Sequence, residues 1–154
     1  MSKPKVLVAR AIFPSVLDRL SQHFDIETNQ PDAVWPKEEL ARRMSDKVGA
    51  FTTSSERIDA AVLDACPHLK IVANMAVGYN NFDVDAMSAR GVLATNAPDV
   101  LTETTADFGF ALLMATARRV TESEHYLRAG KWTKWNYDMF TSSDVHGATL
   151  GILG

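Results

Sequence analysis

The sequence has only one cysteine, Cys66, so an internal disulfide is excluded. A single thiol suits a reducing compartment, and we expect a cytoplasmic protein. The sequence also lacks a long apolar segment, because its most apolar run, residues 108–117, is too short to span a bilayer. The apolar run near the start, residues 6–9, is too short for a secretory signal. We therefore expect neither a membrane partner nor a leader.

Excess positive charge is missing as well. A formal net charge of -3 and an isoelectric point near 5.8 give no electrostatic reason to expect nucleic acid or an anionic membrane as partner. Any anion site must therefore be local. No metal site and no Ser-His-Asp arrangement is expected, because the histidines are not spaced as metal ligands. They are His23, His68, His125 and His146.

What is present is a regular alternation of strand and helix patterns over the first hundred residues. The strand patterns cover residues 5–9, 24–28, 48–53, 70–74 and 92–96. Helix signals lie between them: Pro14 suits a first helical turn, Ser15 and Asp18 have capping-box spacing, and Asp59 and Asp83 suit N-caps. This alternation predicts an α/β fold with a doubly wound parallel sheet and, from right-handed crossovers, the flavodoxin-like strand order 2-1-3-4-5.

The stretch of residues 70–83 organises the rest, because a buried strand gives way there to a glycine-containing loop and then to a helix that Gly91 ends. Ligands of open α/β sheets bind beyond the carboxyl ends of the strands. The backbone amides of Val77 and Gly78 are therefore candidates for holding an anion. The alternative is an ordinary strand-to-helix turn in which Gly78 serves only the backbone conformation.

The character of the chain changes after residue 99. Residues 102–129 suit one long helix whose first half is apolar nearly all round, so we expect it between two domains or two subunits, or else in a central core. An aromatic loop follows, with Trp132 and Trp135 three residues apart. Residues 148–154 read as a further parallel strand that stops at Gly154, where a dinucleotide-binding fingerprint would begin. The chain is therefore expected to be part of a longer protein.

Six segments together resemble the D-2-hydroxyacid dehydrogenases, and most closely the glyoxylate/hydroxypyruvate reductase branch, which includes 2-ketogluconate reductase-like members. The segments are SERID at 55–59, NMAVGYNNFD at 74–83, TNAPDVLTETTAD at 95–107, ARR at 117–119, GKWTKW at 130–135 and GATLGILG at 147–154. They follow the order of the family and extend over almost the whole chain.

The resemblance implies an enzyme about twice this length with two Rossmann-like domains. Residues 1–100 would form the N-terminal part of the substrate domain. Residues 101–154 would hold the interdomain helix, the aromatic loop and the first strand of the NAD(P)-binding domain. The catalytic arginine, glutamate and histidine of the family would lie beyond Gly154, so none is assigned within this chain. A homodimer that uses NAD or NADP is expected.

Site residues follow by matching motifs. Val77 and Gly78 match the loop whose amides hold the substrate carboxylate. Thr105 matches a hydroxyl that touches the cofactor, or else satisfies free N–H groups at a helix start. Trp135 matches a tryptophan that reaches the active site of the partner subunit, or else packs in the dimer. Ser54 replaces a common leucine and would bind a longer polyhydroxylated substrate, unless it faces water.

The resemblance implies NAD(P)H-dependent reduction of a 2-oxoacid, such as glyoxylate, hydroxypyruvate or 2-ketogluconate, to the D-2-hydroxyacid. The fragment alone is expected to be inactive. One alternative is a cofactor-sensing, corepressor-like binding module with the same fold and no turnover. A receiver-type signalling domain shares the strand order, but it needs acidic residues where this chain has Arg10, Thr53 and Ser54.

Overall fold

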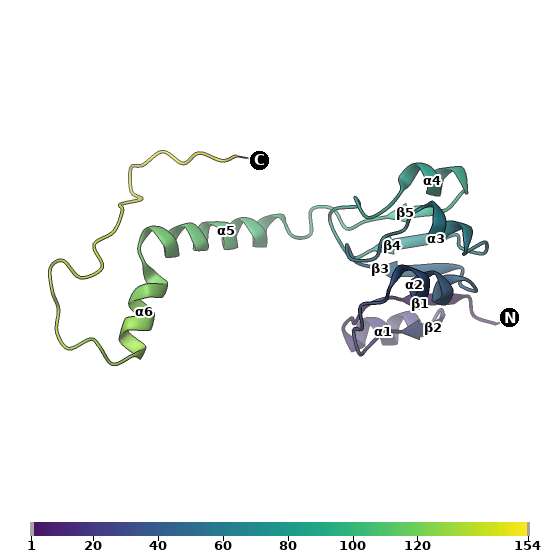
Figure 1. Cartoon of the computed structure of the whole chain (residues 1–154), viewed down its shortest axis with the longest axis horizontal. Helices are drawn as coiled ribbons and strands as arrows, with labels where there is room; N and C mark the ends of the chain where they lie inside the picture. Colours follow the sequence, from purple (N-terminus) through teal and green to yellow (C-terminus); the bar gives the residue numbers. More distant parts are fainter. Residues whose placement is uncertain (1, 154) are drawn as a thin grey trace. The chain divides into compact units, whose positions relative to one another are not determined.

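The computed structural model describes residues 2–153, which form two units. The first unit ends at Val100 and the second begins at Leu101. Figure 1 labels their helices and strands, and each unit is described by itself below.

A parallel sheet of five strands in the order β2-β1-β3-β4-β5 forms the centre of the first unit. Its strands are β1 (Lys5–Val8), β2 (Asp25–Thr28), β3 (Gly49–Thr52), β4 (Ile71–Asn74) and β5 (Leu93–Thr95). Its helices are α1 (Pro14–Ser21), α2 (Lys37–Met44), α3 (Ala60–Asp64) and α4 (Val84–Ala89). The predicted α/β class and strand order are therefore confirmed.

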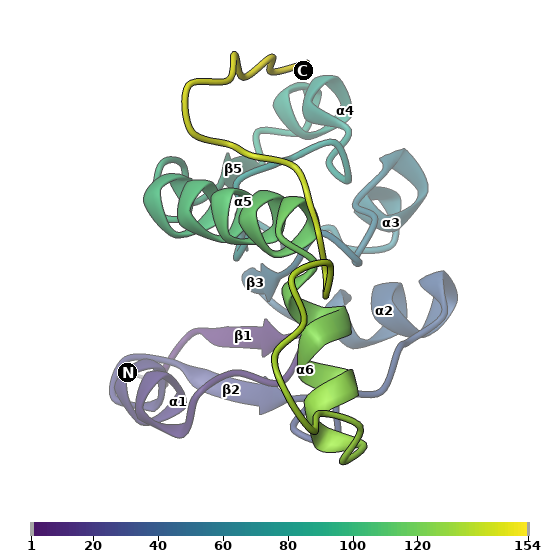
Figure 2. The same ribbon diagram turned by 90° about the vertical axis from the view of Figure 1, so that its left-hand side faces the viewer.

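The core of this unit lies between the sheet and one layer of helices. Figure 2 shows α2, α3 and α4 in a row on one face of the sheet and α1 on the other face. Leu7, Met44, Val62, Val72 and Met87 are at most 1% exposed. By contrast, α1 buries no residue completely, so its face of the sheet is only thinly covered.

Two of the three side-chain N-caps predicted from the sequence are present in the structure. The carboxylates of Asp59 and Asp83 accept hydrogen bonds from the third residue of the helix that each precedes. The predicted capping box of Ser15 and Asp18 is wrong, because Phe13 is the N-cap of α1 and no side chain caps it. Pro14 begins this helix, and the N–H of Val16, which a capping box would satisfy, donates instead to the Phe13 carbonyl over 2.9 Å.

The second unit contains α5 (Thr102–Ala117) and α6 (Val120–Arg128), so the prediction of one long helix over residues 102–129 is wrong. Arg119 adopts a left-handed conformation with φ of 51° and separates the two helices. The loop that follows α6 stabilises this break: Ser143 N–H donates to the Ala117 carbonyl, and Arg118 Nε donates to Ser142 Oγ over 3.1 Å. Long-range contacts thus replace the hydrogen bonds that would continue the helix.

No strand forms at residues 148–153, although the sequence predicts one there. Leu150, Ile152 and Leu153 are exposed, and a strand needs a neighbour to pair its backbone. Gly154 lies outside the described residues.

Helix α5 also exposes apolar side chains, because Phe108, Phe110 and Leu112 are more than half exposed. The expected interdomain or intersubunit position of this helix stays a prediction. Among residues 2–153, no helix has the length and apolarity needed to cross a bilayer.

Candidate functional site

The candidate site lies at the carboxyl edge of the sheet, where four parallel strands end side by side. The segments that leave β1, β3, β4 and β5 begin at Ala9, Thr53, Met75 and Asn96. Because the strands are parallel, these segments meet at one edge, which is where ligands of open α/β sheets bind.

The loop after β4 is fixed through three successive carbonyl groups. The Ala76 carbonyl accepts from the Ala97 N–H over 2.9 Å. The Val77 carbonyl accepts from Asn96 Nδ2 over 2.8 Å, and the Gly78 carbonyl accepts from Asn74 Nδ2 over 2.9 Å. All three carbonyls therefore point toward the protein.

The N–H groups of Val77 and Gly78 consequently point the other way. In a planar trans peptide the N–H is opposite to the carbonyl of the preceding residue. Neither N–H donates to an acceptor among residues 2–153, and both residues are exposed. Two adjacent free donors give a local positive potential that suits an anion. The two free N–H groups are compatible with the predicted anion-binding role, which stays a prediction.

A chain of buried amide side chains supports the loop from beneath. Thr52 Oγ1 donates to Asn74 Oδ1 over 3.2 Å, and Asn74 Nδ2 donates in turn to Asn81 Oδ1 over 3.2 Å. Asn81 Nδ2 donates to the carbonyls of Thr53 and Glu56 over 3.1 and 2.8 Å. These hydrogen bonds join the ends of β3 and β4, and the side chains that make them, Thr52, Asn74 and Asn81, are all buried.

Ser54 lies in the turn that Asn81 joins to the loop. Its side chain is exposed, and it makes no hydrogen bond to another residue in the range 2–153. The structure therefore places Ser54 at the same edge as the candidate amides and leaves its hydroxyl free for a ligand. Contact with a substrate stays a prediction.

Arg10, a basic residue that follows β1 at this edge, is already paired. Arg10 makes two hydrogen bonds to the Asp32 carboxylate, at 2.8 and 2.9 Å, and its guanidinium lies 3.6 Å from Glu56. The hydrogen bond from Arg10 lowers the pKa of Asp32 to about 2, with a further contribution from the Ala11 N–H. Because Arg10 is neutralised by these carboxylates, the backbone amides are the better candidates for anion binding.

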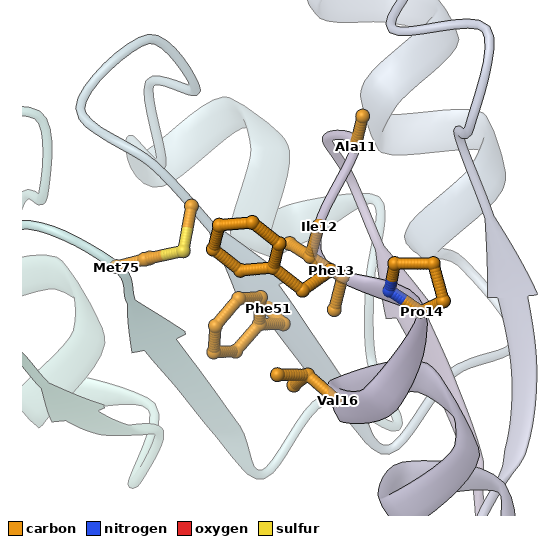
Figure 3. Close-up of a pocket in the computed structure, with 7 residues that line it drawn as sticks. All are labelled: Ala11, Ile12, Phe13, Pro14, Val16, Phe51 and Met75. Atoms are coloured by element: carbon orange, nitrogen blue, oxygen red, sulfur yellow. The ribbon is translucent and has the colours of Figure 1, made fainter.

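An apolar pocket of about 400 Å³ adjoins the loop on the α1 face of the sheet. Figure 3 shows Phe13, Phe51 and Met75 close together in its wall, with Pro14 and Val16 from α1 beside them. Met75 is also the first residue of the loop after β4, so one side of the candidate site is apolar.

The other predicted site residues belong to the second unit. Thr105 lies in the first turns of α5, where its N–H donates to the Leu101 carbonyl and its exposed hydroxyl makes no hydrogen bond to a described residue. No side chain caps the N–H groups at this helix start, and the neighbouring Thr104 Oγ1 donates to the Leu101 carbonyl over 3.2 Å. Trp135 is 76% exposed, and Gly154 lies outside the described residues. Among residues 2–153 no group of His, Cys, Asp or Glu suits a metal ion.

Sequence reasoning missed the residues that hold the loop, Asn74 and Asn96. The sequence pattern that could have identified them is an asparagine at the carboxyl end of each strand: Asn74 is the last residue of β4, and Asn96 follows the last residue of β5. An amide side chain there can donate to a loop carbonyl while its oxygen accepts another bond.

Comparison with known proteins agrees with this geometry. The family model described as D-isomer specific 2-hydroxyacid dehydrogenase, catalytic domain, matches residues 6–148. The chain is 45% identical to glyoxylate reductase of Thermococcus kodakarensis over 99% of its own length. It is 46% identical to glyoxylate reductase of Thermococcus gammatolerans over the same share. The chain spans 47% of each of these relatives, about half of their length.

Solved structures show the same likeness. A protein of Thermus thermophilus has a TM-score of 0.83 and 39% identity over 91% of this chain and 45% of its own. An NADPH-dependent glyoxylate/hydroxypyruvate reductase of Sinorhizobium meliloti, in complex with NADP and malonate, has a TM-score of 0.70 and 37% identity. That match covers 85% of this chain and 40% of the reductase. With its sheet order, its loop after β4 and these matches, the chain belongs to the D-isomer specific 2-hydroxyacid dehydrogenase family.

Proposed function

We propose that this chain binds the carboxylate of a 2-oxoacid through the N–H groups of Val77 and Gly78. In the whole protein this would serve the NAD(P)H-dependent reduction of that oxoacid to a D-2-hydroxyacid. Glyoxylate, hydroxypyruvate and 2-ketogluconate are the candidate substrates. The observation that carries the proposal is the pair of free amides, whose peptide planes are fixed by hydrogen bonds to the carbonyls of Ala76 and Val77.

The chemistry follows from the direction of these donors. A hydrogen bond to a carboxylate is charge-assisted, and it is stronger than one between neutral groups. Two donors on adjacent residues fix both the position and the tilt of the carboxylate, and so orient the attached 2-oxo carbon. NAD(P)H, when bound, supplies the hydride. The exposed Thr105 hydroxyl fits a polar contact to this cofactor, because it has no hydrogen-bond partner among residues 2–153.

Substrate size and assembly belong to the same proposal. Ser54 would hydrogen-bond a hydroxyl of a longer substrate such as 2-ketogluconate. Trp135 would reach the active site of a second subunit in a homodimer, and its 76% exposure leaves the ring available for that contact. The catalytic arginine, glutamate and histidine are still expected beyond Gly154, and a cytoplasmic location is still expected.

Titration of the ¹⁵N-labelled chain with glyoxylate, followed by amide NMR, tests the binding step. The expected result is a saturable shift of the Val77 and Gly78 amide signals. Glycolaldehyde lacks the carboxylate and is the matched control ligand. Equal shifts with both compounds, or no shift at these two amides, would refute the proposal.

Two substitutions at Gly78 sharpen this test. Gly78→Pro deletes the N–H, and the loss of one hydrogen bond to a charged group is expected to weaken glyoxylate binding roughly 10- to 100-fold. Gly78→Ala keeps the N–H, and its added Cβ would lie 3.5 Å from Asn80 Oδ1, an ordinary contact. The alanine variant is therefore expected to bind as the unmodified chain does.

Turnover tests the reaction itself. A full-length protein that contains this chain is expected to oxidise NADH or NADPH in the presence of glyoxylate, hydroxypyruvate or 2-ketogluconate, and the relative rates rank the substrates. Cofactor binding without reduction of any 2-oxoacid would instead favour the corepressor-like alternative.

A further inference from the structure

Asn96 holds the peptide that presents the Gly78 N–H. Its Nδ2 donates to the Val77 carbonyl over 2.8 Å, and the two residues are 19 positions apart in the sequence. The Val77 carbonyl and the Gly78 N–H belong to one planar trans peptide, so fixing the first fixes the direction of the second. Asn96 therefore fixes the direction of one donor of the candidate site.

The alternative orientation of this peptide shows why such a tether matters. Gly78 has no Cβ, so the 77–78 peptide meets little steric resistance to rotation. A rotated peptide would turn the Val77 carbonyl toward the bound anion and the Gly78 N–H away from it. The carbonyl oxygen carries partial negative charge and would repel a carboxylate. The hydrogen bond from Asn96 favours the orientation that attracts the anion.

Of the three groups that hold the loop, Asn96 is the one whose substitution removes a single hydrogen bond to the loop and disturbs no other. The Ala76 carbonyl is held by the backbone N–H of Ala97, which no side-chain substitution removes. The Gly78 carbonyl is held by Asn74, which is 4% exposed and also bonds Thr52 and Asn81. Asn96 is exposed and makes no other side-chain hydrogen bond within residues 2–153.

We infer that Asn96 is a positioning residue for carboxylate binding, acting through the Val77 carbonyl on the Gly78 amide. This inference rests on the proposed function, because it assigns the residue that orients one of the two proposed donors. It also links the end of β5 to the loop after β4, so two neighbouring residues, Asn96 and Ala97, set two successive peptide planes.

The test uses the ¹⁵N-labelled chain with Asn96→Ala and Asn96→Asp. Alanine removes the donor, whereas aspartate keeps the shape, lacks the donor and adds negative charge. The control is Asn80→Ala, since Asn80 is an exposed asparagine nearby whose side chain makes no hydrogen bond within residues 2–153. Each protein is titrated with glyoxylate by amide NMR and unfolded in urea.

Asn96→Ala is expected to weaken glyoxylate binding about fivefold, which corresponds to about 1 kcal/mol for one net hydrogen bond. Asn96→Asp is expected to weaken it further, because its charge repels the ligand. Without ligand, the Gly78 amide signal is expected to move more than the Val77 signal, since the 76–77 peptide keeps its bond to Ala97. Asn80→Ala is expected to retain the affinity and both signals.

The outcomes separate this inference from the proposed function. If the unmodified chain binds glyoxylate at both amides and Asn96→Ala binds it equally well, the positioning role is refuted and the proposed function stands. If the unmodified chain shows no response at these amides, the proposed function is refuted and the inference falls with it. Weaker binding that accompanies a lower urea midpoint and shifts throughout the spectrum would also refute the positioning role.

Discussion

The buried side chain of Asn81 is expected to contribute more to the stability of the first unit than any exposed residue of the same loop. It is 8% exposed, and three hydrogen bonds end on its amide. Asn81→Ala removes all three and leaves the carbonyls of Thr53 and Glu56 without this donor. At about 1 kcal/mol for each net hydrogen bond, the expected loss is about 3 kcal/mol.

Unfolding in urea measures this loss if the signal comes from the first unit alone. Trp35 belongs to that unit, packs against its core and lies 4.3 Å from the guanidinium carbon of Arg43. Replacing Trp132 and Trp135 with phenylalanine leaves Trp35 as the single tryptophan, since the chain has three. With a slope of about 1.5 kcal/mol per molar urea, the midpoint is expected to fall by about 2 M.

Two further variants control the interpretation. Asn80→Ala changes the neighbouring exposed asparagine and is expected to alter stability by at most about 0.5 kcal/mol. Asn81→Asp keeps the acceptor for Asn74 but turns a carboxylate oxygen toward two carbonyls, so it is expected to be less stable at pH 7 than at pH 4. Equal urea midpoints for Asn81→Ala and Asn80→Ala would refute the structural role of the amide chain.

Three other predictions follow from the core and the charges. Leu7→Ala is expected to destabilise the first unit by about 2–5 kcal/mol, because the side chain is fully buried. Urea unfolding followed by Trp35 fluorescence measures this loss, and a value below about 1 kcal/mol would contradict the prediction. Burial raises the pKa of the Cys66 thiol to about 11, so a disulfide reagent at pH 8 is expected to react only after unfolding, and rapid reaction of the native chain would contradict that. The hydrogen bond from Arg10 lowers the Asp32 pKa from 3.8 to about 2. The pair therefore stabilises the folded state above about pH 4, and this stabilisation is lost as the pH falls toward 2. The stability difference between the unmodified chain and Asp32→Asn is therefore expected to shrink over that range, and a pH-independent difference in urea unfolding would refute it.

Much of the first unit could be predicted from local patterns. Apolar strands, the caps at Asp59 and Asp83, and Gly91 with its φ of 65° are short-range features that a few neighbouring residues determine. The alternation of these elements, together with right-handed crossovers, leaves few strand orders open. The amides of Val77 and Gly78 could be proposed because a glycine follows a strand at the binding edge.

The tertiary structure decided which groups hold those amides and where the helices end. The partners of the loop carbonyls come from Asn74 and Asn96, and only folding brings the ends of β4 and β5 together. The break at Arg119 depends on hydrogen bonds that Arg118 and Arg119 donate to a loop more than 20 residues later in the chain, at Ser142 and Thr141. The sequence by itself determined the parallel sheet and the position of the turn proposed to bind an anion, because periodicity and turn chemistry are local. Folding determined the direction of the donors, because a peptide plane is fixed by hydrogen-bond partners that lie far away in the sequence.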